Sequence, residues 1–160
     1  MVDAFDRFDP ASAAEAGVDL ERVLWVRGPV CTLENARPAL VDRAVRQAIR
    51  ALDLIVRAGG MAVTVLDLSD VPALFFRALP ATTWMRLARA NAGREMACVV
   101  IADRPVGRSA RGATIRLAVS GRWEGESLQS RRLAALDVQA TVGQVRRPGQ
   151  DLATWILKSA

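Results

Sequence analysis

The chain has 160 residues, of which 51% are hydrophobic, and its formal net charge is +5 at pH 7. It contains no histidine and no tyrosine, its two cysteines lie far apart, and Lys158 is its only basic residue that is not an arginine. This composition excludes histidine-based catalytic triads, most metal-centred catalysis, a disulfide framework and a phosphate-binding loop that uses a lysine.

The length predicts one compact domain over residues 1–160. No apolar run approaches the roughly 20 residues of a membrane-spanning helix, and the acidic start MVDAFDRFDP lacks the apolar stretch of a secretory signal. We therefore expect a cytoplasmic protein without membrane association, in which Cys31 and Cys98 are ordinary free thiols. The basic charge suits an anionic partner, nucleic acid or an acidic protein surface; the alternative is that the arginine-rich surface only reflects genomic base composition.

Apolar runs alternate with helical patterns in the first two thirds of the chain. Apolar residues recur at spacings of three and four from Pro38 to Ala58, which predicts an amphipathic helix that ends at Gly59 and Gly60. Continuous apolar strands between helices predict a parallel α/β sheet covered on both faces. Shorter helices are expected over 10–17, 72–79 and 82–94, and strands over 23–26, 62–67 and 97–103.

After residue 113 the pattern changes. The segments TIRLAV, LDVQATVGQV and TWIL alternate apolar and polar residues with a period of two, which predicts antiparallel strands with one exposed face. RRPGQ, between the last two, has the composition of a hairpin turn. We therefore expect a single mixed sheet, parallel first and antiparallel at its C-terminal edge.

Several segments together resemble RecA-type recombinases. VDAFDRFDPASAAEAGVDLERVLWVRG resembles the region after the first core strand of that family, AVTVLDLSD its Walker B strand, and ACVVIAD the strand whose end senses nucleotide. The resemblance covers nearly the whole chain and implies a RecA-like three-layer sandwich with a parallel central sheet and antiparallel C-terminal strands. It also implies that the family's N-terminal P-loop unit is absent, because Met1 stands about where that unit's strand would finish.

The departures from the RecA pattern resemble those of one branch of that superfamily, the ImuA-type proteins. The position of the catalytic glutamate falls on Phe5, that of the sensor glutamine on Asp103, and the DNA-binding loop is reduced to RPVGRSARGA. ImuA-type proteins are catalytically degenerate RecA relatives encoded beside an ImuB-type Y-family polymerase homologue. The resemblance implies an adaptor in a DNA-damage-induced (SOS) translesion-mutagenesis complex, which binds the ImuB-type protein, with self-association as an open option.

Asp67 stands at the Walker B position. Without a phosphate-binding loop we interpret it as an inherited acid that is hydrogen-bonded to nearby backbone or to Ser69, and we expect neither a metal nor a cofactor. Asp103 is expected near it, at the carboxyl end of the adjacent strand, but two acids without a metal-bearing substrate or a nucleophile define no reaction. The sequence therefore predicts no enzymatic activity. Asp70 is expected to cap the helix that follows it.

A loop after the last parallel strand is a candidate DNA-binding segment. It carries Arg104, Arg108 and Arg111 among glycine, serine and alanine, and arginines on such a loop can follow a phosphate backbone. Within it, GRSARGAT matches the Walker A spacing but has Ala113 where the lysine belongs, so we interpret the match as coincidental. A solvated loop is the alternative.

Tryptophan beside arginine is typical of protein-binding surfaces. Trp84 lies on an arginine-rich helix, and Trp123 lies near Arg131 and Arg132 in GRWEGESLQSRRL. All four are candidate partner-binding residues. The alternatives are burial of the tryptophans in the core and an arginine surface that is only solvated.

Three other functions stay open. A nucleic-acid-binding module would bind ssDNA weakly, without sequence preference, and lose affinity as salt rises. SulA-type cell-division inhibitors are also RecA-like without ATPase activity, and inhibition of FtsZ assembly would favour that function. The last is an ATPase made incomplete by truncation, for which Phe5 at the glutamate position predicts negligible hydrolysis.

Overall fold

The computed structural model describes residues 1–30, 36–106, 112–125, 127, 129–144 and 153–158. The chain divides into two compact units, Met1–Gly107 and Arg108–Ala160, which we describe separately. The single domain expected over residues 1–160 stays a prediction. Among the described residues, no helix has the length and apolarity that crossing a bilayer requires.

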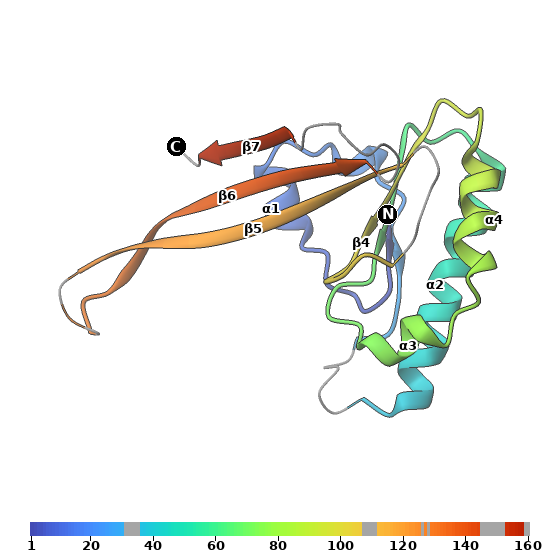
Figure 1. The fold of residues 1–160 in the computed structure, drawn as a ribbon, viewed down its shortest axis with the longest axis horizontal. Coiled ribbons are helices and arrows are strands. Elements are labelled where there is room, and N and C mark those ends of the chain that lie inside the picture. The colour runs from blue at the N-terminus through green and yellow to red at the C-terminus, as the bar shows by residue number, and fades with distance from the viewer. Residues whose placement is uncertain (31–35, 107–111, 126, 128, 145–152, 159–160) are drawn as a thin grey trace. The chain divides into compact units, whose positions relative to one another are not determined.

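The first unit contains a parallel four-stranded sheet in the order β2-β1-β3-β4 (Figure 1). Its parallel strands confirm the sequence pattern, although the strand expected over 23–26 begins only at Val26. The register places Asp3 between Arg27 and Asp67, so three charged residues lie side by side where the strands end. The strands are β1 Val2–Asp3, β2 Val26–Arg27, β3 Val63–Asp67 and β4 Ala97–Ile101.

Three helices lie on one side of this sheet (Figure 1): α2 Pro38–Ala58, α3 Ala73–Arg77 and α4 Thr82–Asn91. Helix α2 has the predicted bounds. Proline suits its first turn because the N–H that proline lacks would have no partner there, and Gly59 ends it at a φ of 72°. Its buried stripe is made of Val41, Ala44, Val45, Ala48, Ile49, Leu52 and Val56.

A short helix, α1 Pro10–Glu15, precedes the 3₁₀ turn η1 Leu20–Arg22. Asp9 caps α1, because its carboxylate accepts hydrogen bonds from the backbone N–H groups of Ala11 and Ser12. The chain leaves the helix through Gly17, whose φ is 87°. The short helix predicted over 10–17 and its glycine stop are therefore confirmed.

The burial of the parallel sheet differs between its strands: both residues of β1 are buried, whereas residues alternate in β3 and β4. Thr64 and Leu66 of β3 are fully buried, whereas Val63 of β3 and Val99 and Ile101 of β4 are exposed. The alternation follows from the strand period of two. The prediction that both faces are covered, as in a three-layer sandwich, stays a prediction.

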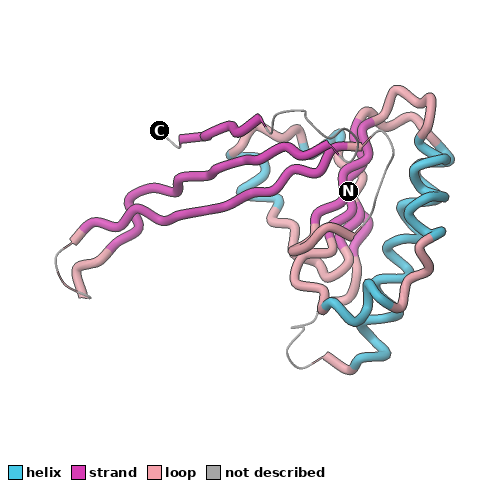
Figure 2. The backbone as a smooth tube through the Cα atoms, viewed as in Figure 1, coloured by secondary structure: helices cyan, strands magenta, loops and turns pink. Residues whose placement is uncertain are grey.

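The second unit is an antiparallel sheet in the order β5-β6-β7. Its strands are β5 Ala113–Glu124, β6 Arg132–Gln144 and β7 Ala153–Lys158, and Figure 2 shows β5 and β6 as long extended segments. The predicted antiparallel strands are confirmed. The single mixed sheet is wrong, because these strands form a sheet of their own. The predicted turn RRPGQ lies outside the described residues.

Candidate functional site

Strands β1 and β2 end in a polar cluster built around Asp3. This residue is 1% exposed. Its Oδ1 accepts a hydrogen bond from the backbone N–H of Phe5 at 3.3 Å. Its Oδ2 accepts from the backbone N–H of Phe8 at 2.8 Å and from Trp25 Nε1 at 3.3 Å. These donors replace the water that burial removes, so Asp3 ties the loop after β1 to the residue before β2.

Asp67 is the register neighbour of Asp3 and is half-buried at the end of β3. Its Oδ1 accepts hydrogen bonds from the backbone N–H of Ser69 at 2.9 Å and from Ser69 Oγ at 2.6 Å. The interpretation that this acid is hydrogen-bonded to Ser69 is confirmed. One of the two carboxylate oxygens of Asp67 is therefore already hydrogen-bonded to the turn that follows β3.

A second acid of the loop after β1 holds strand β2. Asp6 has a φ of 58°, and its two oxygens accept hydrogen bonds from Arg27 Nε and Nη2, both at 2.7 Å. The Arg27 guanidinium also lies 4.4 Å from the centroid of the Trp25 ring, which meets Phe8 edge-on at 5.3 Å. Together these contacts hold the loop after β1 against the end of the sheet.

The hydrogen bonds from Arg27 lower the pKa of Asp6, and the nearby positive charge acts in the same direction. The carboxylate therefore binds its proton less readily in the folded chain than in the unfolded one. The resulting stabilisation is complete above the ordinary aspartate pKa of about 3.9 and is lost as the pH falls through the lowered pKa.

Asp70 does not cap α3. That helix begins after Pro72 without a hydrogen bond from any capping side chain. Asp70 has a φ of 61°, a left-handed conformation that aspartate tolerates, and its carboxylate forms an ion pair with Arg7. The prediction of a cap is wrong, because the acid instead ties the turn after β3 to the loop after β1.

Gly28 closes the cluster beyond β2. Its backbone N–H donates to the carbonyl oxygen of Asp3 at 2.7 Å, and a β-carbon at this position would lie 2.0 Å from the carbonyl oxygen of Ala4. Phe5, which the resemblance to RecA-type proteins would place at their catalytic glutamate, is 3% exposed and belongs to the hydrophobic core. The chain's own groups therefore pack this edge of the sheet.

These residues do not fit a magnesium–nucleotide complex of the RecA type. Such a complex needs an acid for the hydrated metal, a carboxylate for the attacking water and a lysine for the phosphates. Here Asp67 accepts from Ser69, Phe5 is buried, and the single lysine stands near the other end of the sequence. The described residues contain no group of three or more side chains placed to hold a metal ion.

The loop after β4 is described only in part. Asp103 and Arg104 are exposed, and Asp103 lies beyond Ile101, the residue whose register partner is Asp67. Arg108 and Arg111 lie outside the described residues. The proximity of Asp103 to Asp67 and the arginine surface for DNA both stay predictions.

Among the described residues, Cys98 belongs to none of the sites discussed above. Cys98 is a free thiol, and its partial burial beside the core raises its pKa. Cys31 lies outside the described residues.

The two candidate partner-binding tryptophans differ in exposure. Trp84 is half-buried and packs against the core, which leaves little of it for a partner. Trp123 on β5 is 53% exposed, and the Arg131 guanidinium lies 5.8 Å from its ring centroid. Arg132 forms an ion pair with Glu124 at 3.3 Å. The structure therefore brings Trp123, Arg131 and Arg132 together on one exposed hairpin.

An apolar stripe on β5 was missed as a candidate surface. Ile115, Leu117 and Val119 are 62%, 62% and 60% exposed, which is unusual for three large aliphatic side chains in a row along one strand face. The period-two pattern predicts that they share a face. It does not show that this face is open, because the same pattern would arise from a face packed on a core.

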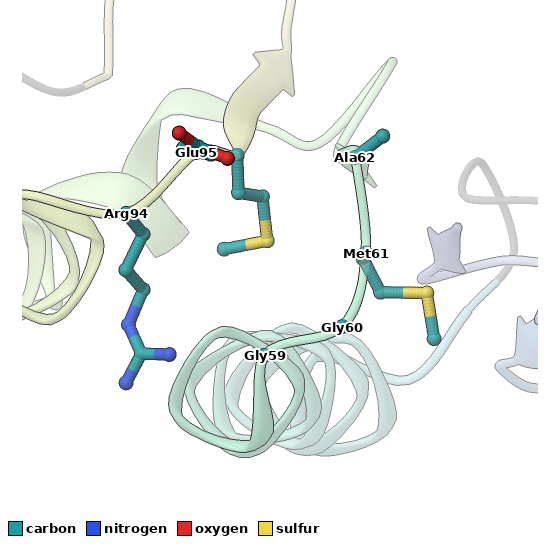
Figure 3. Close-up of a pocket in the computed structure, with 7 residues that line it drawn as sticks. Gly59, Gly60, Met61, Ala62, Arg94 and Glu95 are labelled. Atoms are coloured by element: carbon teal, nitrogen blue, oxygen red, sulfur yellow. The ribbon is translucent and has the colours of Figure 1, made fainter.

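A hollow of about 510 Å³ lies at the opposite, amino-terminal edge of β3 and β4 (Figure 3). Arg94 donates hydrogen bonds there to the carbonyl oxygens of Ala90 at 2.8 Å and Arg57 at 3.1 Å, which belong to the last turns of α4 and α2. Its guanidinium thus serves two helix ends, so we assign the hollow a structural role. The lining residues are Gly59, Gly60, Met61, Ala62, Arg94, Glu95 and Met96.

No protein-family model matches the chain, and no curated protein sequence matches it. What the resemblance to RecA-like and ImuA-type proteins implies about function is therefore proposed below.

Proposed function

We propose that this chain is a non-catalytic adaptor of the ImuA type, with a degenerate RecA-like fold, that binds an ImuB-type polymerase homologue in translesion mutagenesis. The packed end of the parallel sheet carries this proposal. A RecA-like ATPase would hold its nucleotide there, whereas here Phe5 fills the core and the chain's own hydrogen-bond donors engage Asp3 and Asp67. A scaffold whose reactive edge serves its own architecture is suited to binding rather than to chemistry.

The distribution of charge and apolar surface favours a protein partner. Residues 1–107 contain thirteen basic and thirteen acidic residues, whereas residues 108–160 contain nine basic and four acidic ones. The excess positive charge therefore accompanies the exposed apolar stripe in the second unit. Most of this stripe is aliphatic and offers no ring on which a base can stack, with Trp123 at its end as the exception, so the surface suits an acidic protein better than single-stranded DNA.

A titration of the full chain against the ImuB-type protein from the same genome tests the proposal. We expect a Kd of about 1 μM or tighter at low salt that weakens only modestly at moderate salt, because salt screens the charge pairs but not the apolar contacts. Trp123→Ala should weaken this binding roughly tenfold or more, as tryptophan anchors do. Arg43→Ala, an exposed change on α2 of the first unit, is the matched control and should leave the Kd unchanged.

Absence of binding at either salt concentration would refute the proposed partner. Affinity for single-stranded DNA that falls steeply with salt would instead support a nucleic-acid-binding module. Inhibition of FtsZ assembly by the purified chain would support the function of SulA-type division inhibitors.

A further inference from the structure

Strand β5 is a long edge strand. It spans twelve residues and stands at the end of the order β5-β6-β7, so among the described residues only β6 pairs with it. Edge strands present unpaired backbone N–H and C=O groups, and natural proteins guard them with proline, lysine, bulges or short length. β5 contains neither proline nor lysine, and its register shifts only near its end, between Arg122 and Trp123.

The two faces of β5 differ in chemistry. Ile115, Leu117 and Val119 lie on one face of β5, and the apolar stripe continues on that face to Trp123. Gly121 lies between Val119 and Trp123, and a β-carbon there would lie 3.0 Å from Trp123 Nε1 and from Leu133 of β6, so both side chains cover the glycine. Arg116 and Arg122 lie on the opposite face and are exposed. A segment laid along this edge would therefore meet aliphatic side chains on one side and guanidinium groups on the other.

We propose that the edge of β5 binds an extended segment of a partner protein, in which apolar residues alternate with polar ones and the polar face carries acidic residues. Backbone hydrogen bonds to β5 would supply affinity, and the alternating side chains would supply specificity. Apolar residues of the segment would pack beside Leu117 and Val119. Its acids, spaced like Arg116 and Arg122, would pair with those two arginines.

Charge complementarity selects this occupant. The second unit carries more than twice as many basic as acidic residues, so a second copy would bring one positive surface against another. Single-stranded nucleic acid would satisfy the arginines and could stack one base on Trp123, but it would leave Ile115, Leu117 and Val119 uncovered. The inference rests on the proposed function only in taking the partner to be a protein.

A pair of synthetic peptides tests this surface with the full chain. The probe is a fluorescently labelled peptide of about ten residues, close to the length of β5, in which valine alternates with threonine and two glutamates replace threonines at the spacing of Arg116 and Arg122. The comparison peptide has arginine at both glutamate positions. We expect the acidic peptide to bind at least roughly tenfold more tightly, measured by fluorescence anisotropy.

Charge reversal of the protein provides the decisive arm. The double variant Arg116→Glu, Arg122→Glu should reverse the preference, so that the arginine peptide binds more tightly than the acidic one. Leu117→Ser should weaken both peptides alike, and Arg43→Glu, an exposed change on α2, should change neither. Because all these side chains are exposed, each variant should keep the wild-type melting curve, which shows that it is folded.

Equal binding of the two peptides, or an unchanged preference in the charge-reversed variant, would overturn the proposal. So would dimerisation through β5 that the acidic peptide fails to compete with, or an oligonucleotide that displaces the peptide. The ImuB-type titration is independent of these outcomes. Peptide binding without ImuB binding would refute the proposed partner alone, and ImuB binding without peptide binding would refute this surface alone.

Discussion

Replacing Gly28 by alanine is expected to lower the free energy of unfolding by about 3 kcal/mol or more. The new β-carbon would lie 2.0 Å from the carbonyl oxygen of Ala4 and 2.5 Å from its carbonyl carbon, and both are backbone atoms that cannot rotate away. β2 would have to move away from β1, which lengthens the 2.7 Å hydrogen bond from Gly28 to Asp3. Urea unfolding followed by tryptophan fluorescence measures the loss.

Gly17→Ala is the matched control for this prediction. Nothing lies within 4 Å of a β-carbon at Gly17, so only the left-handed backbone, with its φ of 87°, opposes the change. We expect a cost of about 1 kcal/mol there. If Gly28→Ala destabilises the chain no more than Gly17→Ala does, the close packing of β1 on β2 is wrong.

Asp3→Asn is the other change with a large expected effect, again about 3 kcal/mol. The amide has one acceptor oxygen in place of two, so its NH₂ group would face either the N–H of Phe5 or the N–H groups of Phe8 and the Trp25 ring. Two donors would then oppose each other in a buried position. Chemical unfolding measures the loss, and Trp25 fluorescence reports whether the ring leaves its place beside Phe8.

The exposed ion pair between Asp42 and Arg46, one helical turn apart on α2, supplies the control. Asp42→Asn removes the charge of that aspartate without burying an unmatched donor, so its effect should stay within about 0.5 kcal/mol. A similar small effect at Asp3 would contradict the role of its carboxylate as the organiser of this end of the sheet.

Periodic and locally capped segments of this fold could be predicted from the sequence. Helix α2 has a stripe that repeats at helical spacing, proline at its start and glycine after its end, so its bounds follow from local chemistry. β3 and β4 are apolar runs between helices and are equally clear. Strand β2 is short because Trp25 turns to Asp3 while Arg27 holds Asp6, contacts between residues that are distant in sequence.

The candidate site could be predicted only in outline. The hydrogen bond between Ser69 and Asp67 is local and was expected, whereas the ion pair that takes Asp70 away from a cap comes from Arg7, far along the chain. The spacing of acids in DAFDRFD gives no sign of which acid is buried. In β5 the alternation separates two faces but does not say which face other parts of the chain cover.

The central claim is that the carboxyl end of the parallel sheet is architecture and not a nucleotide site. A calorimetric titration of Mg²⁺–ATP into the full chain tests this claim most directly. We expect no saturable heat up to concentrations of about 1 mM, which would place any affinity weaker than about −4 kcal/mol. Saturable binding of Mg²⁺–ATP that Asp67→Asn abolishes would contradict the claim.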